Sequence, residues 1–221
     1  SITAEPSSKG CAIAAAGSTA EAFRQGMASQ AREILGGDLS FSVENRDFTD
    51  KERAAFDKLG VTTYAAVARA MAQAPSGDRR LVSLRGVDAR FPLAGTVTLE
   101  GAPNLAAALA DRDGLPGAAV EPALLDRLHL KIGDRFEAGP MTLVVRARLI
   151  SEPDGLSRGF SMAPRVLVRR AVLERSGLLA PGGLSGRAVR VALAPSQDPR
   201  AIGKAVQAAL PESHLRVRDR L

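Results

Sequence analysis

The sequence predicts an α/β (α+β) chain built from split βαβ-type units. Segments in which apolar and polar residues alternate are interleaved with segments at helical spacing, most clearly from residue 96 onwards. Clusters of Gly and Pro separate these segments, as turns do. The composition, with 45% apolar and 24% charged residues, is that of a folded globular protein. Its 221 residues allow one large core or two small lobes.

The first predicted element is a helix over residues 18–35. Ser18 and Glu21 have the spacing of a capping box, in which each side chain bonds the backbone N–H of the other residue. An apolar stripe follows at helical spacing: Phe23, Met27, Ala31, Ile34 and Leu35. Gly36 and Gly37 are expected to end this helix.

A strand, a short helix and an ambiguous segment come next. Residues 39–44 alternate between apolar and polar and predict a half-buried strand. Thr49 and Glu52 repeat the capping-box spacing and open a short helix that Gly60 ends. Residues 61–74 are rich in Ala, which favours a helix, but they also fit period two. A turn at 75–78 and a strand-like run at 81–87 make a hairpin the alternative.

Two Gly/Pro breaks are candidate lobe boundaries and hinges. The first spans residues 91–95, and the second spans 152–159. Such residues can absorb changes of φ and ψ, although plain loops have the same composition. The candidate hinge residues are Pro92, Gly95, Pro153, Gly155 and Gly159. Glu152 and Asp154 flank Pro153, and this turn composition predicts that both carboxylates are exposed to solvent.

The remaining segments alternate between strand and helix. Strands are predicted at 96–100, 118–121, 135–137, 141–150, 165–169, 188–194 and 215–218. Helices are predicted at 104–111, 123–130, 171–177 and 199–210, with Pro122 suited to the first helical position of the second.

The positive charge does not predict a nucleic-acid-binding protein. The formal charge is +6, but most Arg residues are scattered singly. The chain has no Trp and a single Tyr, which argues against an aromatic platform for bases. A position near anionic lipid headgroups fits the charge better.

No catalytic, cofactor-binding or metal-binding residue is predicted, and the chain is not expected to be an enzyme. One Cys and two isolated His residues do not make a zinc site. Neither a nucleophile elbow nor a phosphate-binding Gly-rich motif occurs. Gly36-Gly37-Asp38 invites a diguanylate-cyclase interpretation, but a helix stop explains both glycines.

The start of the chain leaves two alternatives open. Residues 11–17 are apolar but too short to span a bilayer, and no run of about 18 apolar residues occurs in the sequence. This fragment is either the trimmed end of a membrane helix or the start of an Ala-rich helix. Residues 1–10 resemble a linker. The single Cys11 does not indicate a redox compartment.

Several short runs, taken in order, resemble the FtsX-like ABC-transporter permeases of the YbbP branch. They cover about residues 15–221. They are AREILGGDL at 31–39, LVSLRGVD at 81–88, FPLAG at 91–95, EPALL at 121–125, LKIGD at 130–134, EPD at 152–154, PRVLV at 164–168 and GLLAPG at 177–182.

This resemblance implies a MacB-like periplasmic core, with a porter-like lobe and a second lobe inserted into it. Residues 1–36 would be a leader and stalk helix, 37–88 and 161–221 the porter-like lobe, and 89–160 the inserted, sabre-like lobe of mixed α/β structure. Leu124, Leu128, Phe136, Leu143 and Val145 are expected to form the core of the inserted lobe. The two ends of the chain are expected to leave on the same side, with the stalk stripe partly uncovered or covered by a second copy.

The resemblance also implies a location and partners. The domain would lie in the periplasm, attached to the bacterial inner membrane, and a cytoplasmic ABC ATPase subunit would move it through a transmembrane region. A second copy of the permease, a hydrophobic substrate (lipid, lipoprotein or peptide) and a periplasmic protein are further partners it allows. It supplies no catalytic residue and no cofactor. The alternatives are a stand-alone periplasmic binding or adaptor module and a small hydrolase.

Overall fold

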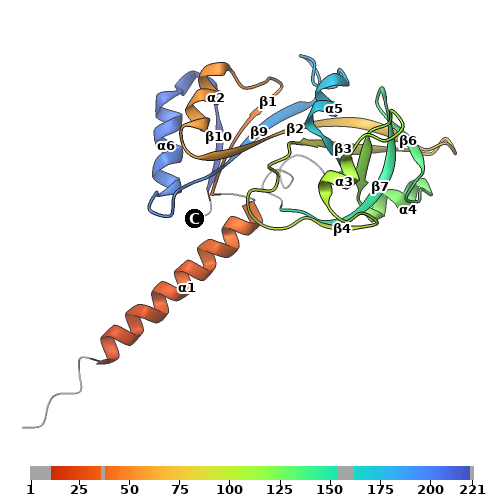
Figure 1. The fold of residues 1–221 in the computed structure, drawn as a ribbon. Coiled ribbons are helices and arrows are strands. Elements are labelled where there is room, and N and C mark those ends of the chain that lie inside the picture. Colours follow the sequence, from red (N-terminus) through yellow and green to blue (C-terminus); the bar gives the residue numbers. More distant parts are fainter. Residues whose placement is uncertain (1–10, 36–37, 154–161, 220–221) are drawn as a thin grey trace, which may run out of the picture.

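The computed structural model describes residues 11–35, 38–153 and 162–219 (Figure 1). Within the first helix, it describes the side chains of residues 19–32. Ten strands form one mixed sheet with the order β10-β1-β9-β2-β3-β8-β5-β7-β4, and β6 pairs with β2 and β7. The strands are β1 Leu39–Glu44, β2 Val61–Gln73, β3 Arg79–Val87, β4 Thr98–Glu100, β5 Gly117–Val120, β6 Arg135–Ala138, β7 Met141–Ser151, β8 Arg165–Arg169, β9 Ser185–Ala192 and β10 Arg216–Asp219.

The helices lie mainly at the two ends of this sheet. Figure 1 shows α2 and α6 beside β1 and β10 at one end, and α3 and α4 near β7 at the other. Their bounds are α1 Cys11–Leu35, α2 Asp50–Asp57, α3 Leu105–Leu109, α4 Pro122–Leu128, α5 Arg170–Arg175 and α6 Pro199–Ala209, with a short 3-10 turn at Pro211–Ser213. This mixed arrangement of helices and strands confirms the predicted fold class.

The ambiguous segment forms a strand, β2 at Val61–Gln73, rather than a helix. β2 pairs antiparallel with β3 from Ala65↔Val87 to Gln73↔Arg79, which makes the long hairpin. On its other edge β2 pairs antiparallel with β9, from Val61↔Ala192 to Ala68↔Ser185. Long-range pairing, rather than the helix propensity of Ala, therefore determines the conformation here.

The first capping-box prediction is wrong. α1 begins at Cys11, so Ser18 lies inside the helix. The Glu21 carboxylate accepts hydrogen bonds from Arg24 and Gln25, one turn further on. The Ala-rich run before Ser18 extends the helix upstream because Ala has the highest helix propensity.

The second capping box is confirmed. Thr49 Oγ1 accepts from the Glu52 N–H at 3.2 Å, and the Glu52 carboxylate accepts from the Thr49 N–H at 3.1 Å. Burial alone would raise the pKa of Glu52, but hydrogen bonds from Arg46, Ser213 and Thr49 outweigh it and hold the pKa below its ordinary value. The Glu52 carboxylate in this capping box is therefore ionised at neutral pH.

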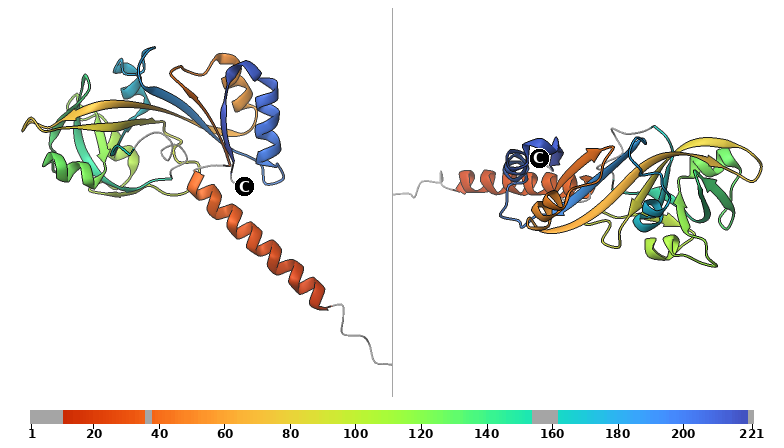
Figure 2. Two further views of the ribbon diagram at one scale, coloured as in Figure 1. Left: turned by 180° about the vertical axis from the view of Figure 1, so that it is seen from behind. Right: turned by 90° about the horizontal axis from the view of Figure 1, so that it is seen from above.

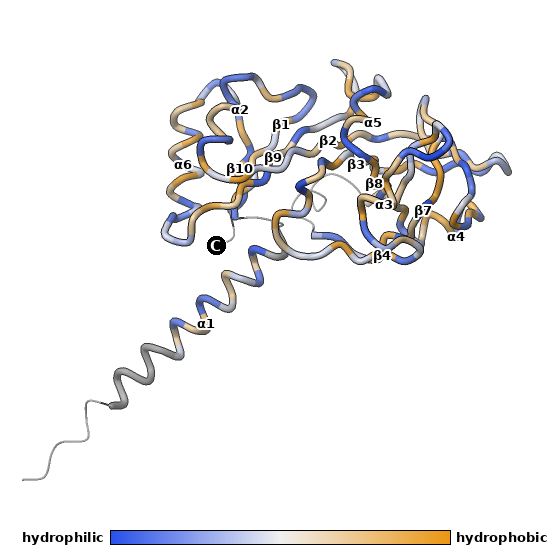
Figure 3. Tube along the Cα trace, viewed as in Figure 1, coloured by the Kyte–Doolittle hydropathy of each residue, from blue (hydrophilic) through white to orange (hydrophobic). Residues whose placement is uncertain are grey.

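α1 projects away from the rest of the molecule (Figures 1 and 2). Phe23 and Met27 are 68% and 56% exposed, as expected for a partly uncovered stripe, whereas the side chains of Ile34 and Leu35 lie outside the described residues. Figure 3 shows hydrophilic and hydrophobic residues interspersed along α1. Among the described residues, no helix is both long and apolar enough to cross a bilayer.

The segment after α1 and the last strand lie side by side, as predicted. β1 pairs with β10 in antiparallel register, from Leu39↔Asp219 to Ser42↔Arg216. The described chain therefore leaves the sheet at Asp219 close to the point where α1 leads into it (Figure 1).

Buried side chains form three clusters. One packs α2 and α6 against β1 and β9, with the rings of Phe41 and Phe56 stacked 4.7 Å apart. The largest lies between the β2–β3 hairpin, β8 and the segment around α4, β6 and β7. The third packs α3 against β5, β7 and β8 and includes Phe91.

The core of residues 89–160 is shared with neighbouring strands. The five side chains predicted for it do fall in one cluster, which contains none of Leu39, Phe41 and Val43. That cluster also contains Val82 and Leu84 of β3 and side chains of β2, β8 and α5. The boundaries at 88/89 and 160/161 stay a prediction.

Candidate functional site

The candidate lobe boundaries at residues 91–95 and 152–159 are called the first and the second crossing below. The segment that leads into the first crossing begins at Asp88, directly after β3. The Asp88 carboxylate accepts hydrogen bonds from the Thr63 hydroxyl, from the Tyr64 N–H at 2.8 Å and from the Arg90 N–H at 3.0 Å. It also lies 3.6 Å from Nη1 of Arg170 on α5. These contacts attach the exit of β3 to both β2 and α5.

The predicted hinge residues of this crossing follow a second anchor. Phe91 is buried in the third cluster, and the guanidinium of Arg190 lies over its ring, 5.7 Å from the centroid. Gly95 has a φ of 76°, in the left-handed region that glycine adopts most easily. Any movement at Pro92 and Gly95 would therefore begin beyond Phe91.

The second crossing begins at a buried ion pair. The Glu152 side chain is fully buried, and its Oε1 accepts from Arg85 Nη1 at 2.8 Å and from Arg165 Nη1 at 3.1 Å. Arg165 also donates from Nε and Nη2 to Oε1 of Glu121, at 2.7 and 2.6 Å. The prediction of a solvent-exposed carboxylate at 152 is wrong, because two arginines from β3 and β8 compensate its charge in the interior.

The rest of the second crossing is only partly described. Pro153 is buried, whereas Asp154, Gly155 and Gly159 lie outside the described residues. The hinge role of all five candidate residues stays a prediction. The described structure places an anchored carboxylate at the start of each crossing: Asp88 before the first and Glu152 before the second.

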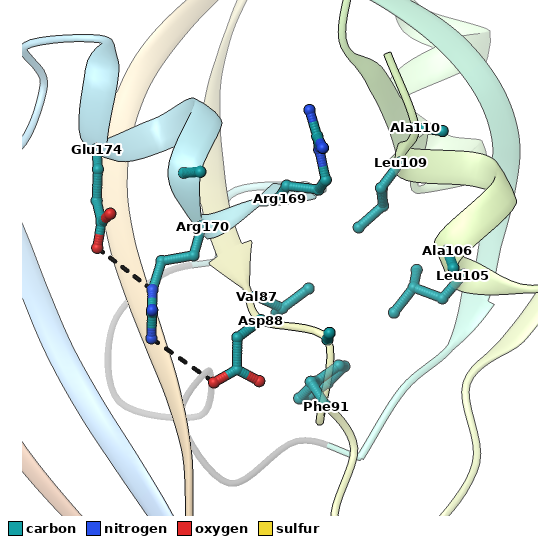
Figure 4. Close-up of a pocket in the computed structure, with 12 residues that line it drawn as sticks. Val87, Asp88, Phe91, Leu105, Ala106, Leu109, Ala110, Arg169, Arg170 and Glu174 are labelled. Carbon is teal, nitrogen blue, oxygen red and sulfur yellow. Dashed lines mark ion pairs between the residues drawn. The ribbon is translucent and has the colours of Figure 1, made fainter.

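A cavity of about 460 Å³ opens between α3, the exit of β3 and the start of α5 (Figure 4). Its apolar lining includes Val87, Phe91, Leu105 and Leu109, and it reaches the first crossing. The size lies within the range of small-ligand pockets, which are mostly apolar with a few polar groups. The pocket can therefore hold an apolar group beside the first crossing.

Charged side chains also line this pocket. Figure 4 shows Arg170 between Glu174 and Asp88, with Nε–Oε1 and Nη1–Oδ2 distances of 3.3 and 3.6 Å. Arg169, which also lines the pocket, pairs with Asp111 at 2.6 Å. Both signs of charge are thus present around an apolar interior.

A polar cavity of about 560 Å³ adjoins the pocket and shares Asp88, Ala89 and Arg170 with it. There Tyr64 Oη donates to Oδ1 of Asp57 at 2.8 Å, and the guanidinium of Arg53 lies 5.0 Å from the Tyr64 ring centroid. Burial and the bond to Asp57 raise the pKa of Tyr64 well above its usual range. Tyr64 is therefore neutral at physiological pH and serves as a hydrogen-bond donor.

The histidines lie elsewhere. His129 caps the C-terminus of α4 with a φ of 54°, and His214 follows the 3-10 turn with a φ of 48°. Neither lines the two cavities. Among the described residues, no group of three or more His, Cys, Asp or Glu side chains could hold a metal ion.

The pocket and the buried ion pairs have no counterpart in the local sequence patterns. The pocket joins residues from 87–91, 105–110 and 169–174, which no local pattern connects. One signal was present: Arg85 lies within the mostly apolar, strand-like run at 81–87, where a buried charged residue needs a partner.

Comparison with solved structures identifies the fold. This mixed sheet with a projecting helix is the MacB-like periplasmic core fold, which confirms the resemblance inferred from the motifs. The periplasmic region of MacB from Actinobacillus actinomycetemcomitans superimposes with a TM-score of 0.54 at 6% identity, over 86% of this chain and 92% of that one. The extracellular domain of the noncanonic ABC-type transporter YknZ from Gram-positive bacteria gives 0.55 at 11% identity, over 82% and 100%.

A relative in sequence is the uncharacterized ABC transporter permease YbbP of Escherichia coli (strain K12). It is 25% identical over 170 residues. The match covers 77% of this chain but 20% of that permease, so the chain spans about a fifth of the length of its relative. No family model matches the chain. The chain thus has the fold of the periplasmic or extracellular domains of two ABC-type transporters and is similar in sequence to part of an ABC transporter permease.

Proposed function

We propose that this chain is the non-catalytic periplasmic domain of an ABC transporter permease in the bacterial inner membrane. It couples ATP hydrolysis on a separate cytoplasmic subunit to the export or extraction of a hydrophobic substrate, such as a lipid, lipoprotein or peptide, or to work on a periplasmic partner. The observation that carries the proposal is the similarity to YbbP over 77% of the chain.

The position of α1 supports a mechanical role. α1 leads into β1, and β1 is paired with both β9 and β10. Gly203 of α6 lies close to β1 and β10. A Cβ added to it would be 2.9 Å from Val217 of β10 and 3.4 Å from Leu39 of β1. A displacement of α1 would therefore move three strands and α6 together.

The pocket is the proposed place where an apolar part of the substrate or partner is held. Because Val87, Asp88 and Phe91 line it, its shape depends on the first crossing. Rotation at Pro92–Gly95 would shift α3 relative to α5 and open or close it. Movement of the first crossing would in this way change how the pocket holds the apolar part of the substrate or partner.

The pocket also favours the alternative, a stand-alone binding or adaptor module. The two functions differ in what the gene encodes beyond residue 221. Three further hydrophobic segments of about 20 residues would support the permease. Their absence from the gene would favour the adaptor.

The test uses the complete permease with its ATPase in lipid nanodiscs, with ATP-dependent transfer of a fluorescent phospholipid as the readout. Ala106 lines the pocket and is exposed, so A106W places a large ring in the cavity. We expect transfer to fall at least several-fold. A107W changes the neighbouring residue of α3, which does not line the pocket, and should retain it. Equal transfer by both variants would contradict the proposal.

A further inference from the structure

Asp38 is a buried acid at the point where α1 meets the sheet. Its side chain is fully buried, its N–H donates to the Val191 carbonyl at 3.0 Å, and Oδ2 accepts from the Leu193 N–H at 2.6 Å. These bonds extend the β1–β9 ladder by one residue and hold the Asp38 carboxylate against the end of β9.

The other oxygen of this carboxylate faces α1. Oδ1 lies 3.4 Å from Nε of Arg32, which is in the last turn of the helix and 40% exposed. A buried carboxylate is costly unless it is paired with a positive charge or hydrogen-bonded on both oxygens. Asp38 meets this condition with one contact from the sheet and one from the helix.

We infer that Asp38 is a positioning residue that fixes the direction of α1 relative to the sheet through Arg32. The pair Arg32–Asp38 joins the last turn of α1 to the start of the sheet.

This inference gives the acid of the Gly36-Gly37-Asp38 motif a structural role in place of the catalytic one that its letters suggest. Its meaning for transport rests on the proposed function, since a joint of this kind would pass movements of α1 to β1 and β9. The geometry itself can be tested on the chain alone, so that failure of one idea is distinguishable from failure of the other.

The test measures the distribution of distances between a spin label on α1 and a spin label on α6 by double electron–electron resonance. Spin labels are placed at A22C and A205C, both exposed, in a C11S background of the 221-residue chain. We expect a narrow distribution that broadens at least two-fold in R32A and in D38N. R32K should restore much of the narrow distribution, because it retains the charge.

R24A is the matched control. Arg24 is also on α1 but pairs with Glu21 within the helix, so its removal should leave the distribution unchanged. R32A is expected to fold, because Arg32 is partly exposed, and circular dichroism verifies the folding of D38N. A narrow distribution in R32A overturns the inference. Equal broadening in R32A and R24A also overturns it, because the effect would then not depend on the contact with Asp38.

Discussion

Buried charge is the main feature of this protein at the scale of single residues. Arg85 and Glu152 are both almost fully buried, and Arg165 and Glu121 extend their network towards the surface. Attraction between opposite charges in a low-dielectric interior offsets the loss of hydration only when every partner is present. Removing one member leaves an uncompensated charge in the core.

We expect E152A to lower the free energy of unfolding by about 3–5 kcal/mol, the range for breaking a buried ion pair. E152Q should lower it less, because the amide oxygen still accepts a hydrogen bond from Arg85. Urea denaturation followed by circular dichroism measures both.

The matched control is E100Q. Glu100 pairs with Arg148 at 3.2 Å, but its side chain is 63% exposed. Exposed pairs contribute about 0–1 kcal/mol, so E100Q should change stability little. A loss in E152A no larger than that in E100Q would show that the buried network does not stabilise the fold.

At the scale of elements, close approach between β3 and α5 depends on one glycine. A Cβ on Gly86 would lie 2.9 Å from Cα of Arg170 and 3.1 Å from Cβ of Leu173. Because both neighbours are main-chain or near-main-chain atoms, α5 would have to move as a unit. α5 also carries Arg170 and Glu174 at the mouth of the pocket.

G86A is therefore expected to destabilise the protein by about 1–3 kcal/mol, the usual penalty for overpacking. G26A is the control, because nothing lies within 4 Å of an added Cβ on α1 and Ala favours the helix by about 1 kcal/mol. Thermal unfolding compares the two. A stable G86A protein would mean that α5 adjusts freely.

At the scale of the whole molecule, the β2–β3 hairpin connects the two ends of the sheet. β2 pairs with β9 over Val61–Ala68, beside the cluster that contains Phe41, and then with β3 and β6 beside the cluster that contains Phe136. β8 lies between β3 and β5, so the last third of the chain also contributes a strand to this end of the sheet.

This continuity predicts a single unfolding transition. F41A and F136A each remove a buried ring from a different cluster, and each should lower stability by about 3–5 kcal/mol. Calorimetry should show that both variants shift one common transition to lower temperature. Two separate transitions, each shifted by one variant, would instead support lobes that unfold independently.

Local patterns in the sequence determined the order of the elements. The strand at 165–169 was predicted with the bounds it has, and Pro122 and Thr49 correctly marked helix starts. These signals succeed because they depend on a few consecutive residues and on intrinsic conformational preferences. The motifs that resemble the permease family also follow directly from the sequence.

Only the tertiary structure decided which distant residues meet. Residues 61–73 became a strand through pairing with β3 and β9, and Glu152 became buried because two arginines from other strands converge on it. The pocket and the contact between Asp38 and Arg32 likewise depend on how separate segments pack. Periodicity and composition carry no information about such pairings, because burial and charge compensation depend on neighbours far apart in the chain.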